Sequence, residues 1–414
     1  MRAERLRALT GEEAARAAEV RALVPGPASV TTAVGAIVAS VRKGGDAALA
    51  EHVARLDDTG GAPIAVAPAE LDAALAALDP AVRAGLEVAI ANVRRVAEAG
   101  VGSDADVRLP QGHTVTLREL PVRSAGIYVP GGRAPYPSTV VMGVVTARAA
   151  GVAEVAVCAP GSHPVILAAC ALCGADRVYR MGGAQAVAAL AYGTETIPRV
   201  DVIAGPGNLY VQEAKRLVSG DVGIDGSLGP SDVLVVADAW ADPELVAADL
   251  LAQAEHGEAT VVCLASEHVP LLEDVARRLA AAPETGAVAA LVEVEDAAAG
   301  LAFADAFAPE HLELVGPGPE ALVDRVRSAG CVFVGASGAT AFGDYVAGSN
   351  HSLPTGGAAR FASALGPRAF RRRMSVVRIG DAARALAGPG AAVAEAEGFA
   401  EHARSMRLRD NQGR

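Results

Sequence analysis

Lysine is almost absent from this sequence: Lys43 and Lys215 are the only two lysines among 36 basic residues, and arginine supplies the rest. Aromatic residues make up only 3% of the chain, so the core must be built from alanine, valine, leucine and isoleucine. Layers of helices and strands packed through small side chains suit that composition. The formal net charge of −12 argues against a nucleic acid or an anionic membrane as a partner.

Membrane-spanning and secretory signals are also missing. No apolar run reaches the roughly 18–20 residues that a membrane span needs, and the N-terminus lacks the apolar region and cleavage site of a signal peptide. The five cysteines follow no spacing framework, which indicates reduced thiols in the cytosol. Cys170 and Cys173 lie in an apolar helical pattern, which favours buried structural thiols over metal or redox work. We therefore expect a soluble, cytoplasmic protein.

Short β-rich runs alternate with helical patterns through the middle of the 414-residue chain. Such alternation predicts right-handed crossovers and a parallel sheet. The expected strands are 125–129, 154–159, 177–181 and 200–204, and the expected helices are 139–150, 164–174, 184–192 and a last one that ends near 218. These units form one compact domain, 126–231.

A second series follows and predicts another α/β layer, completed by the helical segment 28–105. Its expected strands are 232–237, 260–265, 312–315 and 331–334, and its expected helices are 243–256, 269–281 and 319–329. The fold class is therefore α/β, with two Rossmann-like parallel-sheet domains and small appendages at both ends. We place the domains at 1–27 (helical), 28–125 with 232–365 (first α/β domain), 126–231 (second α/β domain) and 366–414 (small C-terminal segment).

No Gly-x-Gly-x-x-Gly motif opens a helix after a strand, so the usual dinucleotide fingerprint is missing. Gly205-Pro206-Gly207-Asn208 does lie at a strand-to-helix turn, where glycines permit close backbone approach and a helix N-terminus favours anions. Taken alone, this motif fits a structural turn better than a phosphate site. The segment 128–133 forms a second turn at a strand's carboxyl end, the usual place for ligands in open α/β sheets.

Two pairs of residues suggest chemistry. Gln253 and His256 are three residues apart on one expected helix and share a face, although for this pair alone a capped helix end is the better interpretation. Glu310 and His311 follow Pro309 in an apolar stretch just before a strand. Glu and His together offer a base and a proton carrier near neutral pH, and a solvated turn is the equally weighted alternative.

Further polar residues gather later in the chain. The segment 343–357 is rich in Gly, Asn, Asp and His without being a charged linker, which indicates an ordered functional loop. Near the C-terminus stand Glu397 and His402, and a lone terminal His is normally a surface residue. Together the segments supply a Gln, an Asp and several His, which suffice for a divalent metal site beside an acid–base pair.

With these motifs in order, the chain resembles the L-histidinol dehydrogenase family. The matching motifs are 126–132 (GIYVPGG), 136–139 (YPST), 182–186 (GGAQA), 205–211 (GPGNLYV), 229–231 (GPS), 253–256 (QAEH), 309–313 (PEHLE), 343–345 (GDY), 350–351 (NH) through 354–357 (PTGG), and 397–398 (EG) with His402. They cover nearly the whole chain, and their common order makes the set far more specific than any single motif.

The resemblance implies a Zn²⁺- and NAD-dependent enzyme of histidine biosynthesis that oxidises L-histidinol through L-histidinal to L-histidine. It assigns the metal to Gln253, His256, Asp344 and His402, one Zn²⁺ per subunit, and the acid–base chemistry to Glu310 and His311. It assigns NAD contacts in 126–231 to Tyr128, Gln185 and Asn208. It assigns substrate binding to Ser231, Gln253, His256, His311, Asp344, His351, Glu397 and His402.

The resemblance also implies an intertwined homodimer, in which the C-terminal Glu397 and His402 reach the partner's site. Three departures from the family pattern are present: 338–342 lacks an expected acidic residue, 226–228 lacks an expected Met-Ala, and Asp232 stands in place of a Glu. A paralogous dehydrogenase of another small alcohol, such as a sulfonated diol, is the closest alternative. The carboxylate of Glu397 disfavours it, because an anionic substrate would prefer a cation there. A zinc-stabilised dimer without activity is the other alternative, and the intact Glu310-His311 pair argues against it.

Overall fold

The computed structural model describes residues 3–24, 30–57, 59–131, 134–161, 163–226 and 231–410. The chain divides into two compact units. One consists of Met1–Gly100 with Val122–Phe370, and the other of Val101–Pro121 with Arg371–Arg414. The domain boundaries expected from the sequence remain a prediction; the predicted boundary at 27/28 and the motif residues Gly132, Gly229 and Pro230 lie outside the described residues.

Five of the described strands in the first unit form a parallel sheet in the order β6-β5-β4-β7-β8. These strands are β4 (Ser124–Tyr128), β5 (Glu154–Cys158), β6 (Arg177–Tyr179), β7 (Val202–Ala204) and β8 (Gly223–Ile224). Side chains alternate between the two faces of each strand. On β4, Ile127 packs into one hydrophobic cluster and Tyr128 into another, so helices cover both faces of the sheet.

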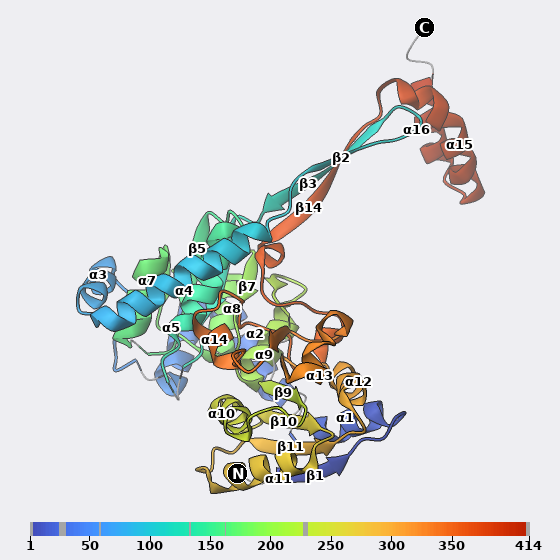
Figure 1. The fold of residues 1–414 in the computed structure, drawn as a ribbon. Helices are drawn as coiled ribbons and strands as arrows, with labels where there is room; N and C mark the ends of the chain where they lie inside the picture. The colour runs from blue at the N-terminus through green and yellow to red at the C-terminus, as the bar shows by residue number, and fades with distance from the viewer. Residues whose placement is uncertain are drawn as a thin grey trace. The chain divides into compact units, whose positions relative to one another are not determined.

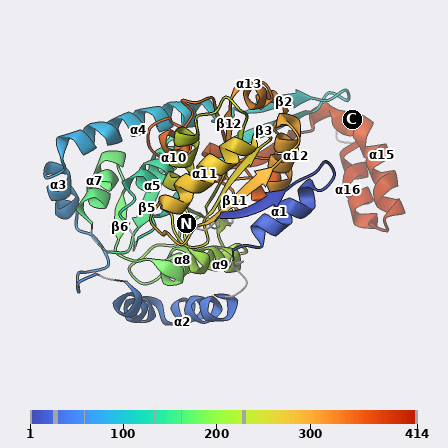
Figure 2. The same ribbon diagram turned by 60° about the horizontal axis from the view of Figure 1, so that its bottom comes forward.

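The helices on this sheet come from two parts of the chain. One face is covered by α2 (Thr31–Leu56), α8 (Gly183–Tyr192) and α9 (Leu209–Val218), and Figure 2 shows α2 running alongside α8 and α9. The other face is covered by α3 (Pro68–Ala76), α4 (Pro80–Ala99), α5 (Pro137–Val140), the π-helical turn η2 (Val141–Val145), α6 (Thr146–Ala149) and α7 (Pro164–Cys173). The helices of 28–105 therefore pack on the sheet of 126–231, which differs from the expectation that they complete the second series.

The π-helical turn η2 interrupts the helix expected at 139–150. At Gly143 an added Cβ would lie 2.3 Å from Cγ2 of Ile127, so only glycine allows this close approach of the helix to β4. The Met142 carbonyl accepts a hydrogen bond from Asn350 Nδ2 at 3.1 Å, and Thr146 Oγ1 accepts another at 3.1 Å. This turn thus holds the segment that carries the predicted substrate residue His351.

Six of the described strands form a second parallel sheet in the first unit, in the order β1-β11-β10-β9-β12-β13. They are β1 (Ala3–Arg7), β9 (Asp232–Ala237), β10 (Val261–Ser266), β11 (Val288–Glu293), β12 (His311–Val315) and β13 (Cys331–Val334). Helices α10 (Pro243–Ala254) and α11 (Val269–Ala281) cover one face, and α1 (Glu13–Arg21) and α12 (Ala297–Phe307) cover the other. The segment ends with α13 (Pro317–Glu320), η3 (Val323–Arg325), α14 (Thr340–Tyr345), η4 (Ala358–Arg360) and η5 (Pro367–Phe370).

The second unit is an antiparallel ribbon with a helical hairpin. The strand order is β14-β3-β2, from β2 (Ala105–Arg108), β3 (Thr114–Pro121) and β14 (Arg371–Arg378). After the short turn η6 (Gly380–Ala382), α15 (Ala383–Ala396) and α16 (Ala400–Asp410) pack against each other through Ala391, Ala394 and Ala403. Figure 1 shows the strands as a long twisted ribbon that ends at this hairpin.

The predicted fold class, α/β with parallel sheets, is confirmed. The helix predicted at 319–329 is wrong. Instead of a continuous helix, Arg327 and Ser328 donate their backbone N–H groups to the carboxylate of Asp305 at 2.8 and 3.0 Å. Strand β1 replaces part of the expected helical N-terminal segment, because Ala3–Arg7 pairs with β11. Cys170 and Cys173 are buried in α7, as the sequence predicts, and burial raises the pKa of both thiols.

Candidate active site

The predicted acid–base residues lie where strands of the six-stranded sheet begin. Ser231 directly precedes β9, and Glu310 and His311 stand at the start of the neighbouring β12. Gln253 lies in the last turn of α10, and His256 follows that helix. Because β9 and β12 are adjacent and parallel, their amino ends bring side chains 79 residues apart into direct contact.

A chain of hydrogen bonds joins Gln253, Ser231 and Glu310. The amide Nε2 of Gln253 donates to the Ser231 hydroxyl at 2.5 Å, and that hydroxyl donates to Oε2 of Glu310, also at 2.5 Å. The backbone N–H of Asp232 donates to the same carboxylate oxygen at 3.0 Å. Burial raises the pKa of Glu310 well above its usual range, and the nearby Asp232 carboxylate adds to that rise. A raised pKa makes the ionised carboxylate a stronger base, which suits a group that takes up protons during a reaction.

His311 lies against this carboxyl group. Its Nε2 is 3.8 Å from Oε1 of Glu310 and 3.9 Å from Oδ1 of Asp344, and its ring centroid is 5.9 Å from that of Phe333. Burial lowers the pKa of His311 to about 4, although the carboxylates of Asp344 and Asp232 act in the opposite direction. The imidazole is therefore neutral over the physiological range and can accept a proton.

Gln253 and His256 have free donor atoms that fit a metal ion. The buried Oε1 of Gln253 accepts no hydrogen bond from any described residue, and the contact with Ser231 fixes the amide in that orientation. His256 Nδ1 lies 3.0 Å from the Gln253 carbonyl oxygen, so a proton on Nδ1 leaves Nε2 with its lone pair exposed. Across the described ranges, no three His, Cys, Asp or Glu side chains gather closely enough to hold a metal. The ligand set therefore stays a prediction.

Asp344 and His351 lie on the same side of the first unit. His351 Nδ1 is 2.9 Å from the Asp344 carbonyl oxygen, and its Nε2 is 3.2 Å from Thr139 Oγ1. These two contacts orient the imidazole and connect the loop after α14 to helix α5. The structure thus brings together Ser231, Glu310, His311, Gln253, His256, Asp344 and His351.

Glu397 and His402 belong to the second unit. Glu397 caps the C-terminus of α15, and the ring of His402 on α16 lies 5.3 Å from the ring of Phe399, measured between centroids. Their part in the site remains a prediction.

Two of the predicted NAD residues meet at the carboxyl ends of β4 and β6 in the five-stranded sheet. The Tyr128 hydroxyl accepts a hydrogen bond from the backbone N–H of Gly183 at 3.0 Å. Asp57 accepts two more in the same place, from the Gly182 N–H and from Gln185 Nε2, both at 3.0 Å. Burial raises the pKa of Asp57. Sequence reasoning missed Asp57, which lies at the end of α2 without a recognisable motif.

The third predicted NAD residue, Asn208, caps helix α9. Its Oδ1 accepts the backbone N–H groups of Tyr210 and Val211 at 3.1 and 3.2 Å. The preceding Gly205 has a φ of +125°, and an added Cβ there would lie 2.1 Å from the Tyr128 carbonyl oxygen. Only glycine can bring this turn so close to the end of β4.

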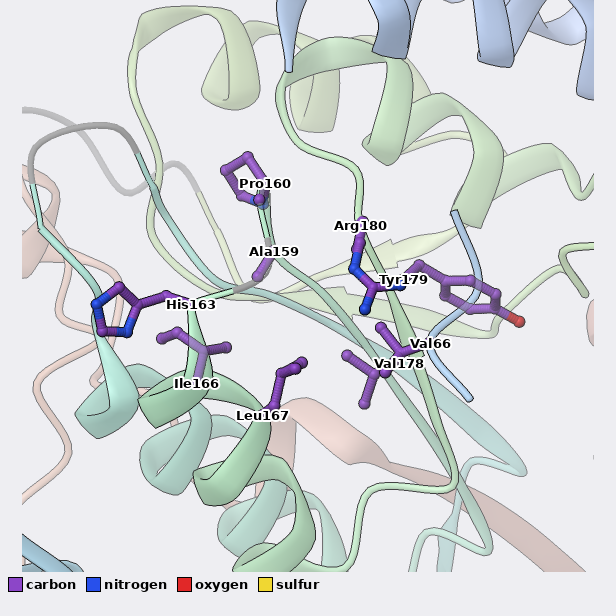
Figure 3. Close-up of a pocket in the computed structure, with 10 residues that line it drawn as sticks. Val66, Ala159, Pro160, His163, Ile166, Leu167, Val178, Tyr179 and Arg180 are labelled. Carbon is purple, nitrogen blue, oxygen red and sulfur yellow. The ribbon is translucent and has the colours of Figure 1, made fainter. Parts of the chain in front are cut away.

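A small pocket lies beside these residues, at the carboxyl ends of β5 and β6. Figure 3 shows it between Pro160, His163, Ile166 and Leu167 on one side and Val178–Arg180 with Val66 on the other. Pro160 also lies next to Gly182, where an added Cβ would be 3.0 Å from its side chain. Carboxyl ends of parallel strands are the usual position of nucleotide sites, so this edge is where a dinucleotide is expected.

Within the described residues, no helix is long and apolar enough to cross a membrane.

Comparison with known proteins agrees with the sequence motifs. The family model described as Histidinol dehydrogenase matches residues 26–410. The histidinol dehydrogenase of Parasynechococcus marenigrum is 44% identical over 393 residues, which cover 91% of this chain and 90% of the relative. That of Leifsonia xyli subsp. xyli is 43% identical over 427 residues, covering 97% and 98%.

A solved structure agrees as well. The crystal structure of histidinol dehydrogenase from Elizabethkingia anophelis superimposes with a TM-score of 0.90 at 30% identity, covering 99% of this chain and 98% of that one. Nothing in these comparisons supports a paralogous dehydrogenase of another alcohol. The chain therefore belongs to the histidinol dehydrogenase family of oxidoreductases.

Proposed function

We propose that this protein oxidises L-histidinol to L-histidinal and then to L-histidine, the last oxidations of histidine biosynthesis, with one NAD⁺ consumed in each. The single observation that carries the proposal is the buried chain Gln253–Ser231–Glu310 beside His311, in which the amide oxygen of Gln253 accepts no hydrogen bond from the described residues. It offers one donor atom for a metal and two groups for proton transfer within a few ångströms.

The metal would be Zn²⁺, one per subunit, held by Gln253, His256, Asp344 and His402. When bound, Zn²⁺ would orient the amino and imidazole nitrogens of histidinol and NAD⁺ would accept the hydride. One aspartate with three neutral ligands leaves a net positive charge, which suits that role. Tyr128, Gln185 and Asn208 are the proposed NAD contacts. The buried Oε1 of Gln185 accepts no hydrogen bond from the part of the chain that the structure describes, which supports a polar contact to a ligand at this position.

In the first oxidation His311 takes the proton of the substrate hydroxyl. Its neutrality follows from burial, which lowers its pKa to about 4. The proton then leaves His311 for solvent, so this step does not need Glu310, whose carboxyl group lies 3.8 Å away. A general base must lie within hydrogen-bond distance of the proton that it takes. The substrate hydroxyl would therefore lie within hydrogen-bond distance of His311, on the side that faces Asp344.

In the second oxidation a water molecule adds to the aldehyde, and Glu310 takes its proton. The Ser231 hydroxyl and the Asp232 N–H both hold Oε2, which leaves Oε1, the oxygen on the His311 side, for the water. The raised pKa of Glu310 makes it a stronger base than an ordinary carboxylate once it is ionised, so the second oxidation should speed up as pH rises through that pKa.

Substrate selection falls to Ser231, His351 and Glu397. The carboxylate of Glu397 would accept a hydrogen bond from the substrate imidazole and so favour a cationic amino alcohol. Because Glu397 and His402 would come from the partner, we further propose an intertwined homodimer in the cytoplasm, with no nucleic-acid or membrane partner.

The test measures NADH absorbance with purified protein, Zn²⁺ or Mn²⁺, L-histidinol and NAD⁺ at mildly alkaline pH. The expected result is two NADH formed per histidinol consumed. One NADH with release of an aldehyde would refute the four-electron reaction, and turnover of another alcohol in its place would refute histidinol as the substrate.

Two variants separate the proposed roles. Glu310→Gln should mainly slow oxidation of L-histidinal, because only that step needs a base for water. His311→Asn should slow both steps by roughly 10²–10⁴-fold, which is the usual contribution of general-base catalysis. If Glu310→Gln abolished the first hydride transfer and left aldehyde oxidation intact, the two roles would be reversed.

A further inference from the structure

Arg21, in the last turn of α1, reaches the turn that leads into Glu310. Its Nη1 lies 2.5 Å from Oδ2 of Asp232. Its Nη2 donates to the carbonyl oxygens of Phe307 and Ala308 at 2.9 and 3.2 Å. The guanidinium carbon lies 3.6 Å from the centroid of the Phe307 ring. One side chain thus uses its fork of donors on a carboxylate and two carbonyls while its flat face stacks on an aromatic ring.

Asp232 connects Arg21 to Glu310 through two hydrogen bonds. Its Oδ1 accepts the backbone N–H of Glu310 at 2.7 Å, and its own N–H donates to Oε2 of Glu310 at 3.0 Å. The side chain of Asp232 is 1% exposed and that of Arg21 is 21% exposed. A buried carboxylate without a partner is strongly unfavourable, so the ion pair with Arg21 offsets the cost of burying Asp232 next to a second carboxyl group.

The two carbonyls held by Arg21 lie at a strained point of the backbone. Ala308 has a φ of +51°, a left-handed conformation that non-glycine residues rarely adopt. It ends helix α12 and is followed by Pro309 and Glu310. Such a conformation costs on the order of 1 kcal/mol or more and persists only where the surroundings impose it. The bonds from Arg21 to both carbonyls are such a constraint.

We infer that Arg21 is a positioning residue for Glu310: through Asp232 and the 307–308 carbonyls it fixes the carboxyl group that activates water in aldehyde oxidation. This inference rests on the proposed function of Glu310. It gives the N-terminal segment, which joins the six-stranded sheet through β1 and α1, a part in the reaction.

The charges around Glu310 give the inference a signature that a purely structural role lacks. Asp232 and Asp344 are the carboxylates near Glu310, and His311 is the neighbouring imidazole. Arg21 lies on the far side of Asp232 and offsets its charge. Loss of Arg21 leaves Asp232 unopposed, which raises the pKa of Glu310 further; loss of the Asp232 charge lowers it.

The experiment measures kcat and KM for L-histidinal and for L-histidinol separately between pH 6 and 10, in the metal-loaded full-length enzyme. For Arg21→Gln we expect kcat for L-histidinal to fall roughly tenfold at pH 7, and the acid limb of its pH profile to move up by about 0.5–1 unit. KM and the first hydride transfer should change less than about threefold. Arg16→Gln is the matched control and should behave as wild type, because Arg16 lies on the same helix and its described ion pairs are to Glu12 and Glu19, not to the site.

Asp232→Asn keeps the test decisive if Arg21→Gln fails to fold, because it predicts the opposite shift: the acid limb should move to lower pH. An equal loss in both oxidations with no shift in either variant would overturn the inference, as would wild-type behaviour of both. Glu310→Gln in the same assay separates the two levels. If that variant oxidises L-histidinal at the wild-type rate, the proposed role of Glu310 fails whatever Arg21 does.

Discussion

Thr340 donates two hydrogen bonds to the carboxylate of Glu313, from its backbone N–H at 2.9 Å and from its hydroxyl at 2.6 Å. Both side chains are almost fully buried. Thr340 begins α14, which carries Asp344, and Glu313 lies on β12 two residues after His311. Asp249 of α10, one turn before Gln253, also hydrogen-bonds Glu313. One carboxyl group therefore joins the three elements that carry the proposed site.

This contact explains how the unusual run 338–342 still supports α14. The family resemblance leads us to expect an acidic residue there, and this chain has Thr340 instead. Glu313, from the neighbouring strand, supplies the carboxylate that accepts the first N–H of the helix. A carboxyl oxygen can accept an unpaired N–H at the start of a helix whether or not the group is ionised, so an acid from another element can perform that task.

Thr340→Val tests this connection. The substitution keeps the shape and the backbone donor but removes the hydroxyl, so a buried carboxylate oxygen loses a hydrogen bond. We expect the free energy of unfolding in urea to fall by about 1–3 kcal/mol. Thr340→Ser, which retains the hydroxyl, should lose less than half as much. Equal losses in both variants would mean that the methyl group, not the hydrogen bond, matters at this position.

Glu313 also predicts a dependence of stability on pH. Burial, with the charge of Asp249, raises the pKa of Glu313 from 4.5 to about 7 in the folded protein. The folded state then holds this proton more tightly than the unfolded state, so the contribution of Glu313 to stability is lost as pH rises from 4.5 to 7.

Glu313→Gln should remove this dependence, because the amide can accept from Thr340 and donate to Asp249 at any pH. We expect the stability of the variant relative to wild type to increase by on the order of 1–3 kcal/mol between pH 4.5 and pH 8. Urea unfolding at fixed ionic strength and Zn²⁺ concentration measures it. A difference that is constant with pH would contradict the raised pKa.

Local patterns explain which parts of the fold the sequence predicts. Helix α11 begins and ends at the predicted residues. Its buried face is formed by residues close together in the sequence, such as Leu271, Val275 and Leu279, so the sequence pattern alone predicts it. Strand β1 has no such local signature, because its sequence Ala-Glu-Arg-Leu-Arg does not alternate apolar with polar residues. It is a strand because Ala3–Arg7 pairs with β11, far along the chain. The sequence of helix α2 likewise does not indicate which of the two sheets the helix covers.

The same distinction holds for the site. Ordered motifs mark Gln253, Glu310 and His311 as candidates, and the structure places these three residues close together. No motif marks Arg21 or Asp57, because their contacts are with residues more than a hundred positions away and no spacing indicates them. Contacts of this kind depend on how distant segments pack together, so only the three-dimensional structure shows them.

A subunit-mixing experiment tests the shared site. His402→Ala should weaken metal binding, and Glu310→Gln should strongly slow the oxidation of L-histidinal. If each site combines Glu310 of one subunit with His402 of the other, a heterodimer of the two variants contains one intact site and one doubly damaged site. Random mixing should then restore about a quarter of the wild-type rate of L-histidine formation from two nearly inactive parents. No restoration, with heterodimers verified by differential tags, would count against intertwined subunits.

The two lysines of the chain allow a final, matched comparison. Lys215 is buried, donates to the Gly205 carbonyl oxygen at 3.0 Å and forms an ion pair with Asp225, which in turn accepts the Gly205 N–H at 2.7 Å. The pair therefore holds both polar groups of the residue that starts the 205–208 turn. A compact ammonium group can meet these acceptors, whereas the larger planar guanidinium cannot occupy the same space.

We expect Lys215→Met to lower the free energy of unfolding by about 3–5 kcal/mol, because it leaves a buried carboxylate unpaired. Lys215→Arg should also destabilise, by about 1–3 kcal/mol, through overpacking. In both variants KM for NAD⁺ should rise more than kcat falls, since the turn presents Asn208. The exposed Lys43 provides the control: Lys43→Arg should change stability by less than about 0.5 kcal/mol. If Lys215→Arg changed stability and KM for NAD⁺ no more than Lys43→Arg does, the buried ion pair would not require a lysine at position 215.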